Sequence, residues 1–161
     1  MELRIAPAEL RSRVHARFGD RLRRAGTFAQ LTVLGAAACL EAAPGPGTLG
    51  LLWTSSRGAF LATRAALAEL RGGELMPYTF IATQPHLAAP LFAQHVHPLA
   101  RSALLYFEAG DERWLEALAR AWLSKDCTRV LLGRVEESTA GADAHRSDWR
   151  LLGATSSSRP A

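Results

Sequence analysis

Short apolar runs and longer segments with one apolar face alternate along the chain. The runs at 48–53, 103–107 and 128–135 are continuous and of strand length, which is typical of strands buried within a sheet. The segment from Trp114 to Leu123 places its apolar residues at the spacing of one helix face. Because strands alternate with helices, the pattern predicts an α/β domain with a small mixed, largely parallel sheet flanked by helices.

Helices are also predicted before and after the first of these strands. Residues 7–24 form an Arg-rich helix candidate with a break near Gly19, and residues 59–70 form an amphipathic helix. Between them, Thr27 is the expected N-cap of an Ala-rich helix over 28–43, which is apolar enough to be buried on most sides.

The remaining segments are less regular. We expect 77–96 to begin extended and to become helical near Gln84, with Pro90 either starting or kinking that helix. We expect 149–152 to form a last short strand at an edge of the sheet.

The stretch from Ala103 to Trp122 predicts a strand that feeds directly into a helix. Between the two, Glu108 to Asp111 forms a sharp turn, with Gly110 available for unusual dihedral angles. Many α/β enzymes hold a nucleophile at such an elbow, because a helix N-terminus stabilises negative charge. Here a carboxylate, Glu108, stands at the apex, and the turn contains neither Ser nor Cys.

At 161 residues the chain predicts one domain over 1–152, followed by a disordered tail over 153–161. Its basic residues are 18 arginines and a single lysine, and seven of the arginines precede residue 25. No aromatic residues interleave with them and no nucleic-acid motif accompanies them, so we interpret this segment as a solvated helix face and expect no nucleic-acid partner.

Metal, cofactor and membrane sites are not predicted. Cys39 and Cys127 stand alone, which favours reduced thiols in a cytoplasmic protein. The three histidines at 86, 95 and 97 lack a nearby carboxylate with ligand spacing, and the turn at 54–58 is too poor in glycine to indicate a nucleotide. No apolar segment reaches the roughly 18 residues that a membrane span needs.

A sheet of three or four strands leaves at least one edge open. If the apolar strand Ala103–Phe107 forms that edge, it would aggregate unless another chain pairs with it. Dimerisation is therefore an expectation of the pattern itself.

Several motifs, in order, resemble the N-terminal half of a β-ketoacyl synthase, a family with the thiolase fold. The similarity covers roughly 20–135. The matching segments are Arg23-Arg24-x-x-x-Phe28-Ala-Gln-Leu31, Thr54-Ser-Ser-Arg-Gly58, Pro77-Tyr-Thr-Phe80, His86-Leu-Ala-Ala89 and Val130-Leu-Leu-Gly133.

The departures from that family are informative. The ungapped match places Glu108 where these synthases hold the cysteine that accepts the acyl chain, and a carboxylate cannot form the required thioester. The two active-site histidines of the family belong to its C-terminal half, which has no counterpart in this sequence. We also expect the first strand of the family fold to be missing or degraded.

The resemblance therefore implies a non-catalytic subunit of the chain-length-factor type, which pairs with an active ketosynthase in polyketide or aryl polyene biosynthesis. It implies that the partner binds along Ala103, Leu104, Leu105, Tyr106 and Phe107. It also implies that a helical stripe lines the partner's acyl pocket, made of Phe80, Thr83, Leu87 and Leu91. An acyl carrier protein, being acidic, would be attracted to Arg21, Arg23 and Arg24.

A second function stays open. The chain could instead be a small independent acyl-transfer or hydrolytic enzyme that uses Glu108 or Cys39 as its reactive group.

Overall fold

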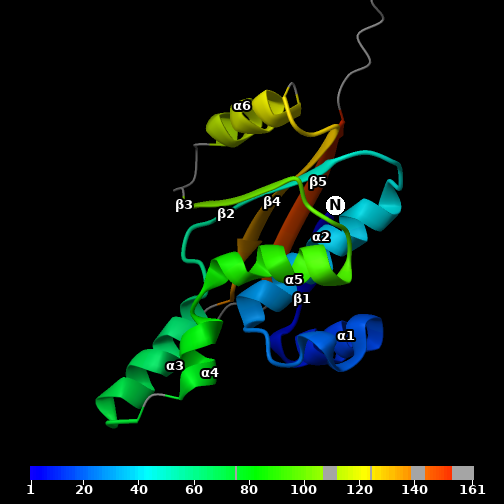
Figure 1. Ribbon diagram of the computed structural model, residues 1–161. Coiled ribbons are helices and arrows are strands. Elements are labelled where there is room, and N and C mark those ends of the chain that lie inside the picture. The colour runs from blue at the N-terminus through cyan, green and yellow to red at the C-terminus, as the bar shows by residue number, and fades with distance from the viewer. Residues whose placement is uncertain (75, 107–111, 124, 139–143, 154–161) are drawn as a thin grey trace, which may run out of the picture.

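The computed structural model describes residues 1–74, 76–106, 112–123, 125–138 and 144–153 (Figure 1). Its strands and helices alternate as predicted, with two short 3-10 turns, η1 and η2. In chain order the elements are β1 (Glu2–Ile5), α1 (Pro7–Phe18), η1 (Gly19–Leu22), α2 (Thr27–Ala42), β2 (Leu49–Ser55), α3 (Phe60–Arg71), α4 (Pro77–Ala82), η2 (Pro85–Leu87), α5 (Ala88–His95), β3 (Arg101–Tyr106), α6 (Glu112–Leu123), β4 (Arg129–Glu136) and β5 (His145–Gly153).

The five strands form one mixed sheet in the order β1-β5-β4-β2-β3. β2 runs parallel to both β3 and β4, whereas β5 is antiparallel to β4 and to β1. The α/β class and the flanking helices are therefore as predicted. The parallel part is confined to the three strands that are joined by helical crossovers, because parallel neighbours require such a connection.

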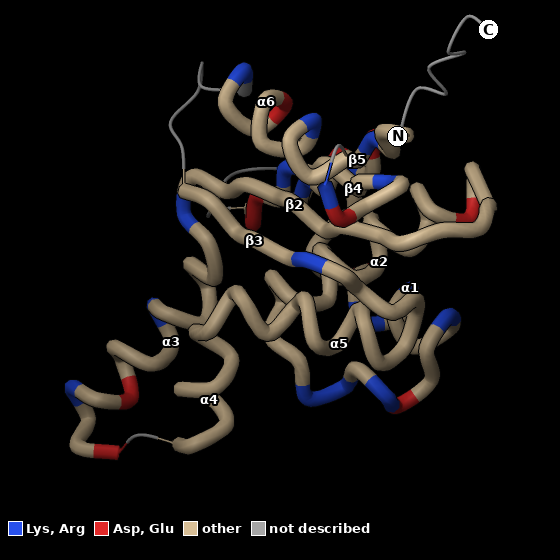
Figure 2. Tube along the Cα trace, turned by 45° about the horizontal axis from the view of Figure 1, so that its top comes forward, with Lys and Arg blue, Asp and Glu red and all other residues tan. Residues whose placement is uncertain are grey.

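Each face of the sheet has its own core. On one face α1, α2 and α5 pack against side chains such as Leu51, Trp53 and Leu131. On the other face α6 packs through Leu115, Ala119 and Trp122 onto a smaller cluster, Leu52, Cys127, Val130 and Leu132. Figures 1 and 2 show α6 and α5 on opposite sides of β2 and β3.

Trp149 of β5 joins α2 to the sheet. Its indole N–H donates to Ser147 Oγ at 2.8 Å, and that hydroxyl donates to the carbonyl of Leu31 in α2 at 2.9 Å. Gly35 of α2 and Gly133 of β4 flank the indole, and a Cβ at either position would lie within 2.6 Å of it. The two glycines therefore make the room that lets α2 approach the strands.

Two sequence predictions about strands are wrong. The first strand of the family fold is present as β1, where Glu2 to Ile5 pair with β5 and Ile5 is buried. Strand β5 spans nine residues and lies inside the sheet, between β1 and β4. The run at 149–152 looked like a short edge strand because β5 alternates polar and apolar residues, as a strand with one apolar face does.

Two predictions about helix starts also differ from the structure. Thr27 is the first residue of α2 and makes no side-chain cap, and Gly26 occupies the N-cap position. The segment at 77–82 is helical rather than extended, with Pro77 in its first turn, where a proline is well tolerated. Pro90 lies in the first turn of α5, so it marks an early start and not a kink.

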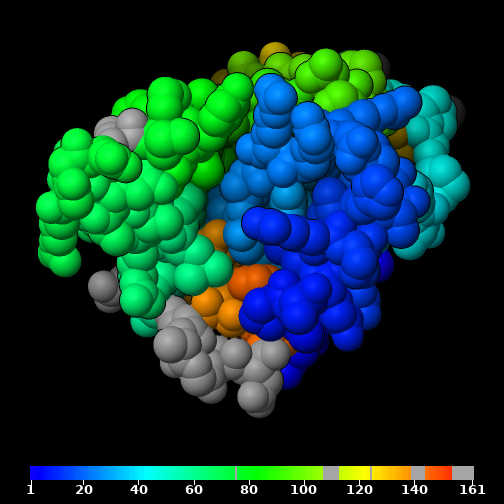
Figure 3. Space-filling model, turned by 90° about the horizontal axis from the view of Figure 1, so that it is seen from below, coloured from blue at the N-terminus to red at the C-terminus, as the bar shows by residue number. Residues whose placement is uncertain are grey.

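Helices α3 and α4 form an arm that projects from the body (Figure 1). Neither helix buries a single residue. Seen from below, the arm (teal to green) lies to one side of the N-terminal helices (blue), and part of the sheet (orange) is visible between their lower ends (Figure 3). Its exposed large apolar side chains are Leu67, Leu70, Met76, Tyr78, Phe80 and Ile81.

No single helix in the described ranges is long and apolar enough to cross a membrane. The pair Pro7–Leu22 and Thr27–Ala42 has the length and composition together, but it bends by 103° between its two halves.

The contact between α2 and Trp149 predicts an effect of Gly35→Ala. The new Cβ would lie 2.2 Å from Ser147 Oγ and 2.6 Å from the indole nitrogen, and both groups are held by hydrogen bonds. We expect the free energy of unfolding to fall by roughly 1–3 kcal/mol in urea titrations, despite the better helix propensity of Ala. Gly153→Ala is the control, because a Cβ there meets nothing within 4 Å. Equal stability of the two variants would contradict this packing.

Candidate functional site

The parallel strands β2, β3 and β4 end at the same edge of the sheet, in Ser55, Tyr106 and Glu136. Open α/β sheets place their functional groups at such carboxyl ends. The predicted elbow, Glu108 to Asp111, lies outside the described residues, as does Phe107.

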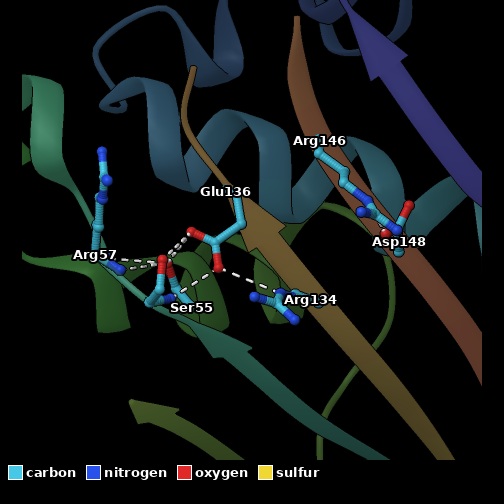
Figure 4. Close-up of polar contacts among 8 residues, drawn as sticks. Ser55, Arg57, Arg134, Glu136, Arg146 and Asp148 are labelled. Carbon is cyan, nitrogen blue, oxygen red and sulfur yellow. Dashed lines mark hydrogen bonds and ion pairs between the residues drawn. The ribbon is translucent and has the colours of Figure 1, made fainter. Parts of the chain in front are cut away.

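Glu136 organises the turn after β2 (Figure 4). Ser56 donates to its carboxylate twice, from the backbone N–H and from the hydroxyl, at 2.8 Å each. Arg134 Nε donates at 3.3 Å from the same strand. The hydroxyl of Ser55, which is fully buried, accepts the N–H of Gly58 at 2.8 Å. The Thr-Ser-Ser turn is thus bound to a carboxylate of the protein itself.

Glu137 binds the N-terminal ends of two helices that have no side-chain cap of their own. The N–H of Leu61 in α3 donates to its carboxylate at 2.6 Å. Burial raises the pKa of Glu137 to about 7, and hydrogen bonds from the N–H groups of Leu61, Phe28 and Phe60 oppose that rise. Glu137 therefore titrates near neutral pH while it connects α2, α3 and the end of β4.

His145 is the first residue of β5 and follows Glu137 by a few residues in the sequence. Its side chain is buried. Its Nδ1 accepts the N–H of Ser138 at 2.9 Å, and burial lowers the pKa of its imidazole. The ring is therefore neutral, with its proton on Nε2. Its role is to close the connection between β4 and β5.

Among the described residues, no hydrogen bond joins a serine hydroxyl of this cluster to a histidine. The hydroxyls of Ser55 and Ser56 both point to Glu136, and His145 accepts from the backbone. Cys39 is buried inside α2, and burial raises the pKa of its thiol, so it is protonated at neutral pH. Burial and the charge of Asp126 raise the pKa of Cys127 likewise. Within the described ranges, no three His, Cys, Asp or Glu side chains are grouped to hold a metal ion.

Strand β3 is an open edge of the sheet. It pairs with β2 alone, and its residues Ala103, Leu104 and Leu105 are only half-buried. Leu104 packs toward the α2 and α5 side, whereas Ala103 and Leu105 pack toward α6. The strand has no proline, and its one charged residue, Arg101, is at its start, where it pairs with Asp126 at 2.7 Å. The segment Ala103–Leu105 therefore lacks the usual protection against pairing with another chain.

Tyr106 connects this edge to the arm. A Cβ at Gly58 would lie 2.7 Å from the Tyr106 hydroxyl, so the ring lies directly over that glycine. Gly58 also has φ +58°, a conformation that glycine adopts at little cost. More than half of Tyr106 stays exposed, and α3 begins two residues after Gly58. The carboxyl end of the open edge therefore adjoins the base of α3.

The predicted acyl-pocket residues do not form one helical stripe. Phe80 is in α4, Thr83 follows that helix, Leu87 ends η2 and Leu91 is in α5. The helix expected from near Gln84 is divided into η2 and α5, and Phe80 lies on a separate helix, α4, in a segment that we expected to be extended. Phe80 is 54% exposed on the arm.

Leu87 and Leu91 instead line a groove together with two of the predicted carrier-protein residues, Arg21 and Arg24. This groove, of about 240 Å³, lies between the α1–α2 turn and the α4–α5 segment. The third arginine, Arg23, lines a different hollow with Arg11 and His15. Figure 2 shows basic residues gathered at the α1–α2 turn beneath α5.

The sheet face that α6 leaves uncovered is charged. Over β1, β4 and β5 it has the ion pairs Glu2–Arg4, Arg134–Glu136 and Arg146–Asp148, while Arg150 pairs with Glu116 of α6. Figure 4 shows Arg146 and Asp148 together on β5. A groove of about 500 Å³ runs over these side chains.

Glu136, Glu137 and His145 were not among the sequence candidates. The adjacent carboxylates at the end of an apolar strand are the one signal that could have indicated them. Glu136 and Glu137 accept hydrogen bonds from Ser56 and Leu61, which lie about 80 residues away in the chain, and no local pattern reveals such partners.

The position of Glu137 predicts a pH dependence of stability. Because its folded pKa of about 7 exceeds the ordinary 4.5, the folded state holds a proton that the unfolded chain has released. This contribution is complete below pH 4.5 and is lost as the pH rises through about 7. Wild type should lose on the order of 3 kcal/mol of its free energy of unfolding over this range because of Glu137. Glu137→Gln cannot titrate and should not show this loss, while its amide oxygen still accepts the Leu61 N–H. Urea titrations from pH 4.5 to 8 would measure it.

The control for this prediction is Glu74→Gln, at an exposed position beyond α3. Wild type and Glu74→Gln should lose stability in parallel as the pH rises, and Glu137→Gln should lose less. Three parallel curves would contradict the assignment of the titration to Glu137.

Comparison with known proteins identifies a solved structure with a similar fold. No family model matches the sequence, and no curated protein matches it. The structure matches a chain of the solved complex "Ketosynthase (ApeO) in Complex with its Chain Length Factor (ApeC)" from Xenorhabdus doucetiae, with a TM-score of 0.69 and 15% sequence identity. The match covers 95% of this chain and 76% of that chain. The predicted resemblance is confirmed for the fold: the chain has a thiolase-like α/β architecture.

Proposed function

We propose that this chain is a non-catalytic subunit of the chain-length-factor type that pairs with an active ketosynthase. The observation that supports this most is the open, apolar edge strand β3, in a fold similar to a chain of a ketosynthase–chain length factor complex. On this proposal the subunit helps to shape the acyl pocket of a condensing enzyme in polyketide or aryl polyene biosynthesis.

Pairing along β3 follows from its backbone. The strand is hydrogen-bonded on one side only, so its other side offers a row of N–H and C=O groups to a strand of the partner. We propose an antiparallel pairing along Ala103 to Tyr106, continuing into Phe107 beyond the described residues. The half-buried Leu104 and Leu105 would become fully buried in such a sheet.

The arm extends the same interface. Tyr106 lies over Gly58 at the base of α3, so a partner at β3 would also reach α3 and α4. There Tyr78, Phe80 and Ile81 are each about half exposed, an unusual concentration for a surface that stays in water. We propose that Phe80 and its neighbour Thr83 face the partner's acyl pocket, whereas Leu87 and Leu91 belong to the separate groove.

The charged sheet face supports attachment at the edge rather than over the face. Burying its ion pairs against another layer would require stripping water from each charge, which costs about as much as the pairing returns. By contrast, β3 has a single charged residue, Arg101 at its start, and α4 has none.

We also propose that this chain catalyses no reaction of its own. The second function, an independent enzyme, would need a reactive group at Cys39 or Glu108. Burial keeps the Cys39 thiol protonated, which disfavours it as a nucleophile. Contact of an acyl carrier protein with Arg21, Arg23 and Arg24 is a further element of the proposal, supported by their exposure and positive charge.

Edge pairing predicts the effect of Ser102→Lys. Ser102 is exposed on β3, so the chain should still fold, but a lysine at the junction would oppose strand pairing. On co-expression with a ketosynthase that retains its cysteine and two histidines, we expect wild type to elute as a 1:1 complex in size-exclusion chromatography. Ser102→Lys should weaken this complex at least about tenfold, or 1.4 kcal/mol.

Ser12→Lys is the matched control, because it makes the same change at an exposed position of α1. It should leave the complex intact. A Ser102→Lys complex as tight as that of the control would exclude β3 as the interface.

The proposed lack of catalysis predicts that Glu108→Ala does not alter turnover. In a reconstituted condensation assay with saturating subunit, kcat should stay within about twofold of wild type, since removing an essential group usually costs at least a hundredfold. Activity of the isolated chain that disappears in Glu108→Ala would instead establish the independent enzyme.

A further inference from the structure

We propose that the groove between the α1–α2 turn and the α4–α5 segment binds a small amphipathic anion on this chain itself. The ligand class is an anionic head, either carboxylate or phosphate ester, joined to a short hydrocarbon chain. This inference does not depend on a partner subunit.

The floor of the groove is apolar and pre-formed. Its apolar lining comes from Ala29 of α2, Ala82 of α4, Leu87 of η2 and Leu91 of α5. Gly26 allows this close packing, because a Cβ there would lie 2.9 Å from the carbonyl oxygen of Ala82. The walls therefore hold their separation without a ligand.

A buried glutamine fixes the turn that positions the arginines. The Gln30 amide donates to the carbonyls of Leu22 and Ala25, at 3.0 Å each. Gln30 is only 5% exposed, so this segment between η1 and α2 is rigidly held. Arg21 and Arg24 precede and follow Leu22 on that turn and both line the groove.

The two arginines provide positive charge without a built-in counter-charge. Neither forms an ion pair with a carboxylate in the described part of the chain, and the Arg24 guanidinium lies 5.4 Å from the centre of the Tyr78 ring. The first 25 residues hold seven arginines against three carboxylates, which accounts for the net charge of +4 of the whole chain. An anion at the groove would therefore be attracted both locally and by the surrounding field.

Charge and shape together define the ligand class. A polar anion such as inorganic phosphate would bind the arginines but leave the apolar floor exposed to water. A neutral alkane would contact only the floor and leave the arginines without a partner anion. The volume of about 240 Å³ is below the size of sites for drug-sized ligands, so the hydrocarbon chain must be short. Gln84 and Gln94 at the groove can donate further hydrogen bonds to the head group.

Isothermal titration calorimetry with octanoate and octyl phosphate, both below their micellar concentrations, tests the proposal on the full chain. Saturable 1:1 binding of at least one probe is expected, and the tighter probe identifies the head group. Inorganic phosphate and 1-octanol should each bind at least about tenfold more weakly, because phosphate lacks the hydrocarbon chain that the floor would bury and octanol lacks the charge that the arginines would bind. Absence of saturable binding of both probes would overturn the proposal.

The variants test the location. Arg21→Gln with Arg24→Gln should weaken binding at least about tenfold, and Leu91→Gln should weaken it through the floor. Arg23→Gln is the matched control, because it removes the same charge from the same turn but does not line this groove. Unchanged affinity in the double variant, or equal losses in it and in Arg23→Gln, would overturn the assignment. Thermal melts and circular dichroism would verify that each variant is folded.

Discussion

The contact of Trp149 with α2 is the interaction on which the rest of the structure depends. The indole fills the space left by Gly35 and Gly133, and its N–H begins a chain of hydrogen bonds through Ser147 to the α2 backbone. This contact holds the most apolar helix of the protein against the middle of the sheet. Because α1 and α5 pack on α2, and the groove with Arg21 and Arg24 begins at its first turn, their positions follow from that one approach distance.

Exposed apolar residues and exposed ion pairs lie on different surfaces of this molecule, and the two surfaces suit different surroundings. The edge strand β3 and the arm of α3 and α4 both expose apolar groups, which suits a macromolecular partner. The sheet face beside α6 has paired ions and suits water.

The sequence predicted the segments whose period is unambiguous. Strands β2, β3 and β4 and helix α6 were recognised because continuous apolar runs and a helical apolar face are local signals. It misassigned 77–82, where Pro77 begins a helix instead of an extended segment. It predicted the open edge at β3 but not the other edge, because β1 pairs with β5 from the opposite end of the chain. The role of Glu137 could not be predicted, because it requires two helix N-termini that only the folded chain brings together. Arg21 and Arg24 were selected for charge, but their proximity to Leu87 and Leu91 is a tertiary fact.

The position of β5 has a consequence for biosynthesis. It is synthesised after all the other described strands, yet it is inserted between β1 and β4 instead of being added at the margin. On the ribosome, β1 and the apolar α2 must therefore wait through most of translation before the strand that supports them emerges, since chains are extended at about 5–20 residues per second. During that interval α2 is a target for chaperones, and a message truncated shortly before Trp149 would yield a product that cannot bury it.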